Sequence, residues 1–450
     1  MRSRKSIAVI GSGISGLSAA WLLSQRHEVT LLEAEQRPGG HSNTVDVPTR
    51  AGCVAVDTGF IVYNTASYPN LIALFDHLGV PTVATHMSFA VSLDTGRYEY
   101  AGSGLATLFG QPANIANPGH WRMILDTLRF FREAPGLISA AADETLQLGR
   151  YLADASYSEA FITRHILPMA GAIWSTPSRD VLEFPVAAFV RFFANHGLLQ
   201  VRNRPEWRTV VGGSREYVRR LLAATNGNVR LGEPAQQIAR KPDGVTVTTA
   251  TGAHAYDACV VATHADAALA LLSDAGADER QLLGAFRYSR NHAVLHRDAL
   301  LMPQRRRLWS SWNYLGSGEG RDGSLSVTYW MNKLQPLGPG CEDLFVTLNP
   351  SREIGATARI AAFDYSHPVF DSGAMTAQRH LWSLQARRRT WFCGSYFGYG
   401  FHEDGLQSGL AVAEEIGGVR RPWTVADESG RIHLGIAGTT PLKLTAEAAE

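Results

Sequence analysis

One stretch near the start of the chain, residues 7–33, restricts the possible folds more than any other. It opens with four apolar residues rich in β-branched side chains, a composition that predicts a buried parallel strand. Three glycines follow at once, and the apolar run 17–23 then predicts a helix with few charges. Residues 27–32 predict a second strand, which ends at Glu33. Strand, glycine-rich turn, helix and strand in this order predict an α/β fold with a parallel sheet.

The glycines stand at the spacing Gly-x-Gly-x-x-Gly, and each has its own physical role. Gly11 permits a tight turn, Gly13 lets the backbone approach a pyrophosphate, and Gly16 lets the helix pack closely on the strand. The N-terminus of that helix directs unpaired N–H groups and a partial positive charge at the phosphates. Glu33, about 20 residues further on, is placed to accept hydrogen bonds from both hydroxyls of an adenosine ribose. Together these features predict a dinucleotide site.

The residues after Glu33 indicate which dinucleotide is bound. Residues 37–41, Arg-Pro-Gly-Gly-His, offer a guanidinium and two adjacent glycines, which suit the second side of a pyrophosphate. Residues 57–60 form a further turn. Here the chain resembles the superfamily of flavin-containing amine oxidases and phytoene desaturases, in which Glu-x-x-x-Arg-x-Gly-Gly marks FAD rather than NAD. The resemblance implies that Glu33 binds the adenosine ribose of FAD and that residues 37–40 lie along the cofactor.

A second motif lies near the end of the chain, at residues 390–409. A short strand leads into a glycine-rich loop, and residues 406–417 predict a helix. In the superfamily such a loop covers the isoalloxazine ring, and the helix N-terminus faces the pyrimidine end, where its dipole stabilises the reduced flavin. Ser395 departs from the family, which usually carries Asp or Glu at that position. The two motifs make FAD the expected cofactor.

The motifs also assign individual contacts with FAD. Residues 258–264 between them predict a buried parallel strand that ends in small residues and resembles the superfamily's strand on the adenosine side of FAD. His264 stands where the family usually has a small residue or proline, and it receives no catalytic role. The residues expected to bind FAD are Gly11, Gly13, Ile14, Ser15, Gly16, Glu33, Ala34, Arg37, Gly39, Gly40, His41, Asp57, Gly59, Phe60, Ala235, Ala262, Thr263, Gly394, Ser395, Gly405, Leu406 and Ser408.

The resemblance implies a Rossmann-like FAD-binding domain of the glutathione-reductase type, with an inserted α+β substrate domain that carries an antiparallel sheet. A chain of 450 residues that is 45% hydrophobic is long enough to bury the cores of two domains. A Gly-Gly turn within residues 210–218 returns the chain to the nucleotide domain. The FAD-binding domain is expected over residues 1–75, 205–265 and 385–419, the substrate domain over residues 76–204 and 266–384, and a tail over residues 420–450.

Local patterns predict several elements of the substrate domain. Residues 68–78 predict an amphipathic helix that ends at Gly79, a typical C-cap. Residues 89–93 and 98–100 predict a β-hairpin around an Asp-Thr-Gly turn. Alternating patterns predict the strands of an antiparallel sheet above the flavin at residues 291–296, 308–314 and 324–331, and residues 344–350 add a fourth.

An amphipathic helix is also predicted from about residue 120. Within residues 121–133 apolar side chains recur at helical spacing, with charged residues between them. Two interpretations stay open: the apolar face packs on its own domain, or it touches a membrane or covers an apolar substrate tunnel. The density of Trp, Phe and Leu within residues 173–193 suits a pocket for a hydrophobic substrate, but also an ordinary core.

Composition and charge exclude several classes of protein. The formal net charge of +1 gives no field that favours nucleic acid. Four cysteines stand far apart without a Cys-x-x-Cys pair, so neither a metal site nor a disulfide framework is expected, and a reducing compartment fits. No signal peptide is visible, and no apolar run approaches 18 residues. A cytoplasmic enzyme is expected, with peripheral contact at the inner face of the membrane left open.

Four residues are candidates for a catalytic role beside the flavin: His41, Lys333, His402 and Glu403. In amine oxidases a lysine holds water at flavin N5, and Lys333 is considered for that role, although a lysine on a turn usually faces solvent. His402 and Glu403 form a potential acid/base pair, or else hold the loop by hydrogen bonds. His41 serves either the cofactor's surroundings or catalysis. Cys393 is considered for covalent flavin attachment, but a cysteine at this point of a strand is more often simply buried.

A closer resemblance narrows the substrate. The chain looks like the bacterial predicted NAD/FAD-binding oxidoreductases related to the flavin domain of plant cyclopropane fatty-acid synthases. This resemblance implies oxidation or desaturation of a hydrophobic substrate, such as a methylated or unsaturated fatty-acyl chain, by hydride transfer to flavin N5. The segments that carry it are residues 40–45, 173–175, 195–199, 207–210 and 328–332.

Other functions remain open. An amine oxidase needs an aromatic cage beside the flavin, and a carotenoid-type desaturase shares the tunnel and the FAD. A third reading is a non-catalytic flavin-binding subunit of a lipid-modifying complex. Because a second Gly-x-Gly-x-x-Gly is absent, the expected electron acceptor is oxygen, a quinone or a redox protein. Residues 420–450 are expected to be poorly ordered. The cage candidates are Trp391, Tyr396, Phe397, Tyr399 and Phe401.

Overall fold

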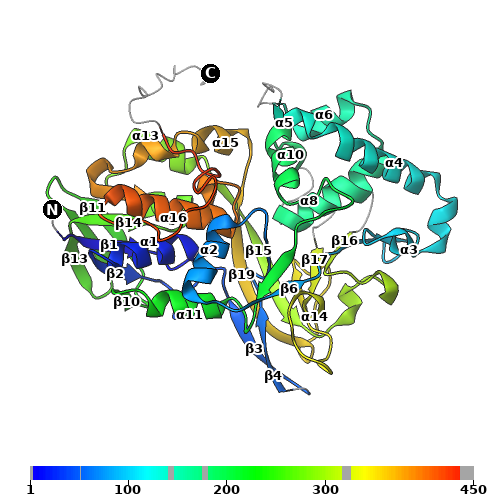
Figure 1. The fold of residues 1–450 in the computed structure, drawn as a ribbon, viewed down its shortest axis with the longest axis horizontal. Helices are drawn as coiled ribbons and strands as arrows, with labels where there is room; N and C mark the ends of the chain where they lie inside the picture. The colour runs from blue at the N-terminus through cyan, green and yellow to red at the C-terminus, as the bar shows by residue number, and fades with distance from the viewer. Residues whose placement is uncertain (1–3, 51, 140–145, 175–180, 317–325, 436–450) are drawn as a thin grey trace.

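The computed structural model of the chain describes residues 4–50, 52–139, 146–174, 181–316 and 326–435. The first two residues of the strand predicted at 324–331 and the end of the predicted tail, 436–450, lie outside these ranges. Within them the chain forms the expected α/β fold, with a parallel sheet on one side and a larger, mainly antiparallel sheet with a layer of helices on the other (Figure 1).

The parallel sheet has five strands drawn from distant parts of the chain. Every pair in it is parallel, and its middle strands are almost wholly buried. Burial on both faces explains why these strands are continuous apolar runs rather than alternating ones. In spatial order they are β10 (Asn228–Arg230), β2 (Glu28–Leu32), β1 (Ser6–Ile10), β14 (Ala258–Val261) and β20 (Thr390–Phe392).

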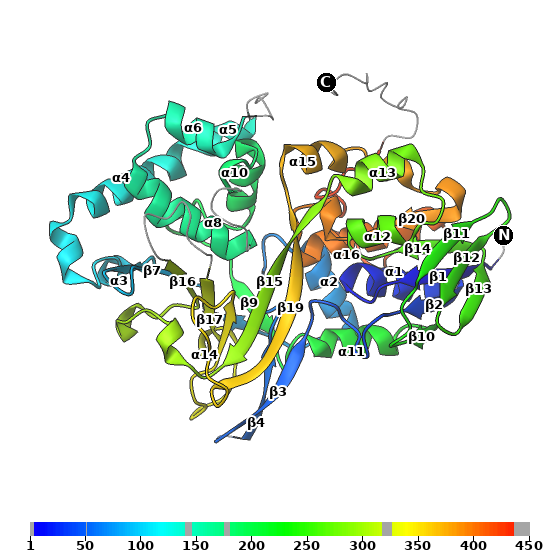
Figure 2. The ribbon, with the colours of Figure 1, turned by 180° about the vertical axis from the view of Figure 1, so that it is seen from behind.

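Alternate residues of β1 face two different cores. Ile7 and Val9 pack with helices α1 (Ile14–Ser24) and α16 (His402–Ile416), whereas Ala8 and Ile10 pack with the opposite layer. That second layer contains a small antiparallel sheet beside β1 and β2, seen from behind in Figure 2. Its strands are β11 (Gln237–Arg240), β12 (Val245–Thr249) and β13 (Gly252–Tyr256), and two helices cover the same side, α12 (Ala265–Leu271) and α13 (Ala277–Gly284).

Helices α1 and α16 approach each other closely because glycines stand at their crossing. A Cβ at Gly409 would lie 2.2 Å from the carbonyl oxygen of Ser15, and one at Gly405 would lie 2.9 Å from Cγ2 of Ile14. Both distances are too short for any real side chain. The small residues in the predicted helix 406–417 therefore serve helix packing, and the helix itself begins earlier than predicted, at His402.

The larger sheet has seven strands, of which the sequence analysis found six. The predicted hairpin is present as β7 (Phe89–Leu93) and β8 (Tyr98–Ala101), and it joins the same sheet. The sheet is not wholly antiparallel, since β16 pairs with β7 in parallel. The predicted strand 308–314 begins only at Trp312, and the long edge strand β19 (Arg359–Val369) was missed. The other members are β15 (Arg287–His296), β18 (Phe345–Leu348), β17 (Ser326–Trp330) and β16 (Trp312–Gly316).

A layer of helices covers one end of this sheet, at the upper right of Figure 1. Aromatic side chains fill its core; Phe130, Phe161, Phe189 and Phe193 are all within 1% of complete burial. The helices are α3 (Leu105–Leu108), α4 (Pro118–Glu133), α5 (Gly136–Ser139), α6 (Leu148–Asp154), α7 (Glu159–Phe161), a π-helical turn η2 (Ile162–Ile166), α8 (Leu167–Trp174) and α10 (Val186–Asn195).

Shorter elements connect the two sides. The predicted helix 68–78 is present as α2 (Pro69–Leu78), and Gly79 caps it at φ +62°. The remaining strands are β3 (Thr44–Thr49), β4 (Gly52–Asp57), β5 (Tyr63–Asn64), β6 (Thr82–Thr85) and β9 (Trp207–Val210). The remaining helices are α11 (Arg215–Ala223), α14 (Met331–Leu334), α15 (Ser372–Gln378), η1 (Pro112–Ala116), η3 (Ala299–Leu301), η4 (Arg306–Leu308), η5 (Leu381–Leu384), η6 (Arg387–Arg389) and η7 (Ser395–Phe397).

Helix α4 has one packed face and one exposed face. Met123 and Phe130 are buried, whereas Trp121, Leu125 and Leu128 keep 46%, 59% and 50% of their surface exposed. The buried face confirms that the helix packs on its own domain. The apolar residues of the other face reach solvent, and contact of that face with a membrane stays a prediction. None of the helices in the described ranges combines the length and apolar character needed to cross a bilayer.

The prediction that the chain is poorly ordered from residue 420 is wrong for residues 420–435. Trp423 stacks on Trp21 of α1, with ring centroids 5.9 Å apart and planes 9° apart. Arg421 is buried and pairs with Glu414 of α16 at 2.8 Å. The prediction rested on the composition of the segment, which is rich in proline and glycine. It failed because the contacts of one tryptophan and one arginine are enough to fix a segment without regular structure.

Candidate functional site

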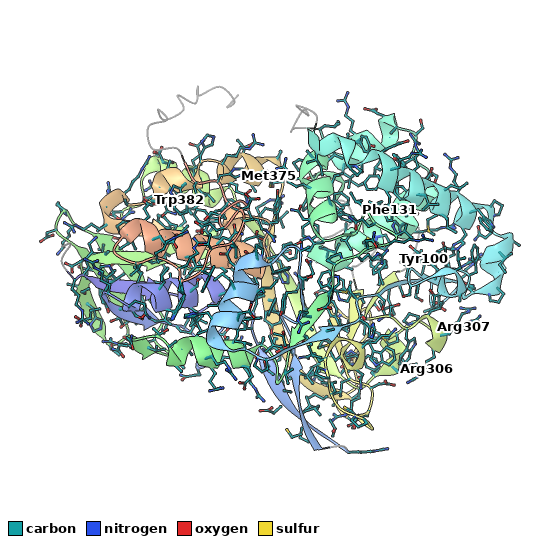
Figure 3. All side chains as sticks on the ribbon, viewed as in Figure 1. Tyr100, Phe131, Arg306, Arg307, Met375 and Trp382 are labelled. Atoms are coloured by element: carbon teal, nitrogen blue, oxygen red, sulfur yellow. The ribbon has the colours of Figure 1, made fainter. Side chains whose placement is uncertain are left out.

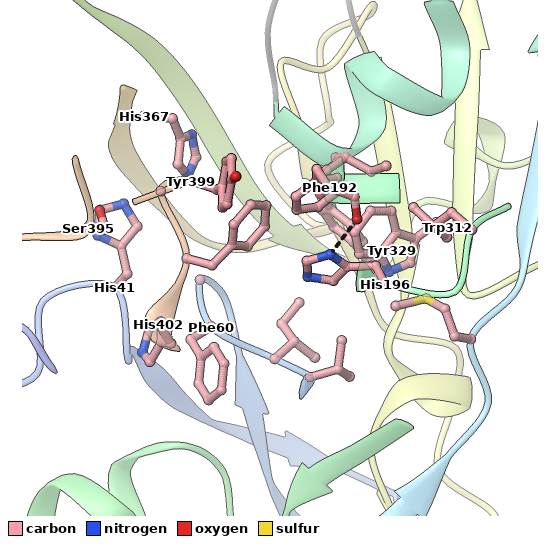
Figure 4. Close-up of a pocket in the computed structure, with 18 of the residues that line it drawn as sticks. His41, Phe60, Phe192, His196, Trp312, Tyr329, His367, Ser395, Tyr399 and His402 are labelled. Carbon is pink, nitrogen blue, oxygen red and sulfur yellow. Dashed lines mark hydrogen bonds between the residues drawn. The ribbon is translucent and has the colours of Figure 1, made fainter. Parts of the chain in front are cut away.

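A cavity of about 860 Å³ is lined from both sides of the fold. At one end its walls are the glycine-rich turns of the parallel sheet, and at the other they are apolar side chains of α4, α8 and α10. Figure 4 shows His41, His402 and Ser395 on the first side and Phe192 and Trp312 on the second. Two more lining residues, Tyr100 and Phe131, lie in the helical half of the molecule (Figure 3).

The first end of the cavity is a cradle built from glycines. Gly11 has φ +99°, and a Cβ there would lie 2.9 Å from the carbonyl oxygen of Ala262. A Cβ at Gly13 would meet no atom within 4 Å, so a side chain there would project into the cavity. Gly40 closes the other side, where its Cβ would lie 3.2 Å from Cα of Gly13. The cradle is shaped for a ligand that touches bare backbone, as a pyrophosphate does.

Glu33 lines the same end at the tip of β2. Its Oε2 accepts hydrogen bonds from the backbone N–H of Ser12 at 2.7 Å and from the Ser12 hydroxyl at 2.6 Å, and its Oε1 accepts one from the N–H of Glu35. These donors fix the carboxylate beside the glycine turn; Oε2 already accepts two hydrogen bonds, whereas Oε1 accepts one and keeps a lone pair. Ser12, which the sequence analysis did not single out, thus orients the residue expected to bind ribose.

Two helices point their N-termini at this end. Ile14 and Ser15 begin α1, His402 begins α16 and Phe401 precedes it; all four line the cavity. The first N–H groups of each helix have no partner within their own helix, so both helices offer donors and partial positive charge to the same space. Close packing at Gly405 and Gly409 keeps the two termini together.

Other predicted cofactor residues support the cradle from outside. Arg37 donates from Nη1 to the carbonyl oxygen of Gly40 at 2.8 Å. Asp57 accepts hydrogen bonds from Thr44, Gln335 and both the N–H and the hydroxyl of Ser214. Burial raises the pKa of Asp57 to about 6, against these hydrogen bonds, which lower it. The residues assigned to FAD that do not line the cavity are Gly16, Ala34, Arg37, Asp57, Ala235, Gly405, Leu406 and Ser408; the other fourteen do.

His402 lies at the centre of the cavity wall. Its ring stacks on Phe60, with centroids 3.7 Å apart, and its Nε2 is 3.0 Å from the Ser42 hydroxyl and 3.1 Å from that of Tyr217. Burial lowers the pKa of His402 to about 3, so the imidazole is neutral near pH 7. The neutral imidazole can donate and accept hydrogen bonds, but it brings no positive charge to the cavity.

His41 belongs to a second cluster, with His264, Tyr365 and His367. Ring centroids lie 5.0 Å apart between His41 and Tyr365, and 5.3 Å apart between His41 and His367. Burial first, and then neighbouring histidines, hold the pKa of His41 well below its usual value. His41 Nε2 is buried and has no hydrogen-bond partner among the described residues. An unpartnered polar atom beside the glycine cradle is the kind of group that a bound dinucleotide satisfies.

The structure does not place two of the four catalytic candidates in the cavity wall. Glu403 is fully buried and accepts hydrogen bonds from the N–H groups of Asn70 and Leu71, at the start of α2. Lys333 donates from Nζ to the carbonyl oxygen of Trp309 at 3.2 Å, and it lies near the Trp330 ring. Adjacency in sequence misled in the first case, because His402 and Glu403 point to different sides of one helix turn.

The aromatic cage needs correction, whereas the expectation that Cys393 is simply buried is confirmed. Tyr396, Tyr399 and Phe401 line the cavity, but Trp391 and Phe397 do not. Cys393 is fully buried in the core between α1 and α16, it is a free thiol, and burial raises its pKa. Its complete burial leaves Cys393 without access to a ligand in the cavity, and the raised pKa keeps it a thiol rather than a reactive thiolate.

The second end of the cavity contains residues that the sequence analysis missed. Two histidines, His165 and His196, project Nε2 atoms that are buried and have no partner in the described part of the chain. Around them the wall is formed mainly by Met123, Ile124, Leu128, Phe131, Met169, Ile173, Phe192, Leu198, Trp312 and Tyr329. A long apolar space with a few polar atoms is typical of a site for a hydrophobic small molecule.

Comparison with known proteins is consistent with this geometry. The model of the flavin containing amine oxidoreductase family matches residues 14–294. A Mycobacterium tuberculosis protein named as a flavin-containing monoamine oxidase, AofH, is 29% identical over 257 residues. That match covers 55% of this chain and 54% of the relative, so the chain spans about half the length of this relative.

Solved structures share the whole fold at low identity. Cyclohexylamine oxidase from Brevibacterium oxydans aligns with a TM-score of 0.63 and 15% identity, over 92% of this chain and 100% of that one. A CLA-producing fatty acid isomerase from P. acnes aligns with a TM-score of 0.65 and 15% identity, over 92% and 98% of the two chains. The same fold therefore serves different substrates, and the walls of the cavity must distinguish between them.

Proposed function

Because the chain belongs to the flavin containing amine oxidoreductase family, we propose that it is an FAD-dependent oxidoreductase that dehydrogenates a long, largely apolar substrate, with a fatty-acyl chain as the substrate class. The observation that carries the proposal is one cavity that joins a glycine cradle to an extended apolar space. Hydrophobic walls favour a substrate whose reacting carbon lies in a hydrocarbon chain.

The residues of the cradle fit FAD. Glu33 would hold the adenosine ribose, the backbone at Gly11, Gly13 and Gly40 would face the pyrophosphate, and His41 Nε2 would gain a partner. When bound, FAD supplies the acceptor for the two electrons that leave the substrate. The helix N-termini of α1 and α16 contribute positive potential on that side.

The side chains between the two ends position the substrate and exclude water. Phe60 and Tyr399 lie between the two ends of the cavity in Figure 4, and Phe401, which also lines the cavity, stacks on Phe192 with ring centroids 4.8 Å apart. Burial keeps His402 neutral, and Ser42 and Tyr217 fix its ring, so it orients a neighbouring group without bringing a charge into the apolar space. Exclusion of water there protects reactive species from hydrolysis.

Amine oxidation is the second candidate, favoured by the name of the M. tuberculosis relative. The cavity wall argues against amine oxidation, because its apolar end offers no negative charge to a cationic substrate. Among the described lining residues only Glu33 and Arg204 are charged when histidine is neutral, and Glu33 lies at the nucleotide end. An ammonium group in the apolar end would find no carboxylate of these residues. Carotenoid desaturation, and a non-catalytic role in a lipid-modifying complex, are further alternatives that the same experiment separates.

The test uses the visible spectrum of the purified protein. Bound FAD is expected to be released by acid, and anaerobic addition of oleate, rather than spermidine, benzylamine or phytoene, is expected to bleach it. Dithionite serves as the control, because it must bleach any competent flavin. Bleaching by an amine alone would contradict the fatty-acyl proposal, and a flavin that only dithionite bleaches would favour the non-catalytic role. Reoxidation by oxygen, a quinone or a redox protein then identifies the acceptor.

A further inference from the structure

The mouth of the cavity is marked by residues that both line it and reach solvent. Leu105, Leu128 and Val201 line the cavity and keep 77%, 50% and 63% of their surface exposed. Arg204, three residues after Val201, also lines the cavity and is exposed. A guanidinium therefore stands at an otherwise aliphatic mouth, in reach of both the solvent and the cavity.

Arg204 differs from most arginines of this protein in having no carboxylate partner within the described ranges. Its Nε donates to the carbonyl oxygen of Gln200 at 2.8 Å. Nearby Arg208, by contrast, is paired with Glu206 at 2.6 Å. The two terminal amino groups of Arg204 are thus available to an anion, which a guanidinium binds with two parallel hydrogen bonds.

The interior of the cavity presents hydrogen-bond acceptors, in contrast to the donor groups of Arg204 at the mouth. His196 donates from Nδ1 to the carbonyl oxygen of Phe192 at 3.0 Å, an oxygen that can only accept, so Nε2 is left with a lone pair (Figure 4). Burial lowers the pKa of His196 to about 3, which keeps the ring neutral.

His165 also carries its lone pair on Nε2, and this follows from the hydrogen bonds of Tyr100. The hydroxyl of Tyr100 donates its single proton to the carbonyl oxygen of Arg164 at 2.8 Å. His165 Nδ1, 3.0 Å from the same hydroxyl, must then be the donor, and its Nε2 carries a lone pair. Burial, and then the charge of Arg204, lower the pKa of His165 to about 4. The two interior imidazoles thus both present acceptors, which disfavour an anion.

We propose that Arg204 anchors the anionic head group of the substrate at the mouth of the cavity, so that the apolar chain enters tail first. This inference rests on the proposed function and narrows it to chains that end in a carboxylate or a phosphate. A free fatty acid and an anionic lipid share that chemistry. Neutral esters and amines lack it.

Calorimetric titration of the flavoprotein with ligands that share one chain tests the anchor. The probes are oleate, 1-oleoyl-lysophosphatidate, methyl oleate and oleylamine, all below their aggregation concentrations. The wild type is expected to bind at least one of the two anions about 10-fold or more tightly than methyl oleate, as a charge-assisted hydrogen bond allows. The stronger of the two anions identifies the head group as carboxylate or phosphate.

Variants of Arg204 then test whether this side chain causes the preference for anionic ligands. Arg204→Gln is expected to remove the preference for the anion and leave methyl oleate unchanged, while Arg204→Lys keeps part of it. Arg202→Gln is the matched control, because Arg202 is exposed two residues away and does not line the cavity.

Three outcomes would overturn the anchor. Equal binding of oleate, lysophosphatidate and methyl oleate, with no effect of Arg204→Gln, refutes it and leaves the proposed apolar substrate intact. Tightest binding of oleylamine refutes it in favour of amine oxidation. Failure of all four ligands to bind refutes the anchor together with the proposed function.

Discussion

At the scale of single residues, Glu33 carries the most specific prediction. Replacing Glu33 by Gln removes the charge that Ser12 and Glu35 stabilise beside the cradle. Because hydrogen bonds to a charged group contribute about 1.5–3 kcal/mol, FAD should bind roughly 10- to 100-fold more weakly. Fluorescence titration of the apoprotein with FAD measures the change. Glu28→Gln, at the exposed start of the same strand, should bind FAD like the wild type, and equal affinities of the two variants would refute the ribose role.

A second residue-scale prediction concerns Glu403, whose carboxylate caps α2 from another helix. Glu403→Gln keeps one acceptor but removes the charge that two N–H groups and Asn70 Nδ2 bind. We expect the free energy of unfolding to fall by about 1.5–3 kcal/mol, while the rate of flavin reduction per bound flavin stays unchanged. Urea unfolding and stopped-flow reduction separate the two effects. A large loss of rate at full stability would instead restore Glu403 as a catalytic group.

At the scale of elements, the crossing of α1 and α16 is the most constrained contact. Gly409→Ala puts a Cβ 2.2 Å from the Ser15 carbonyl oxygen, so the helices must separate. Overpacking of this kind destabilises a protein by about 1–3 kcal/mol, and separation should also weaken FAD binding, because both helix N-termini line the cavity. Gly136→Ala in α5 is the control, since its Cβ meets nothing within 4 Å and alanine favours a helix. Thermal unfolding should therefore shift in opposite directions for the two variants.

At the scale of the whole molecule, buried histidines should make the fold sensitive to acid. Burial lowers the pKa of His296 and His367 to about 4, in addition to the four histidines discussed above, His41, His165, His196 and His402. A histidine whose pKa is lower in the folded state binds fewer protons there than in the unfolded state once the pH falls below 6.5. Stability is therefore complete above pH 6.5, and each such histidine removes about 2 kcal/mol by pH 5.

The measurement is urea unfolding at pH 7.5, 6.5 and 5. His296→Gln removes one of these groups that does not line the cavity and should reduce the loss between pH 7.5 and 5 by about 2 kcal/mol. His86→Gln, at an exposed position, should reproduce the wild-type loss. An unfolding free energy that does not change between pH 7.5 and 5 would contradict the prediction.

The nucleotide half of this fold could be predicted from sequence because its signals are local. A glycine spacing, a helix and an acidic residue occur within residues 7–33, and each has one dominant physical reason. The strand β19 was missed although Tyr365 and His367 on it line the cavity; its alternation is interrupted by Ala361 and Ala362, and a proline stands near its end.

For the apolar end, the sequence left open a hydrophobic pocket at residues 121–133 and 173–193, and Leu128, Phe131 and Phe192 do line it. The polar groups of that end could not be predicted, because they meet only through long-range packing. His165, His196 and Arg204 carry no local pattern that separates them from structural histidines and surface arginines. Lys333 is the opposite case, because the sequence suggested a place beside the flavin. In the structure its side chain instead binds the carbonyl oxygen of Trp309 and does not line the cavity. Which polar atom faces a cavity depends on the tautomer and on the partner that the other ring nitrogen finds, and neither is written in the order of residues.

The closing segment 420–435 has a consequence for how the protein is made. Its Trp423 rests on Trp21, and the edge strand β20 joins the parallel sheet only from residue 390 onward. A ribosome that has synthesised the chain up to residue 261 has therefore completed four strands of that sheet but has made neither β20 nor α16, the helix that covers it. The glycine turn is made well before these parts, so the nascent chain exposes this core until residues 390–423 have been synthesised.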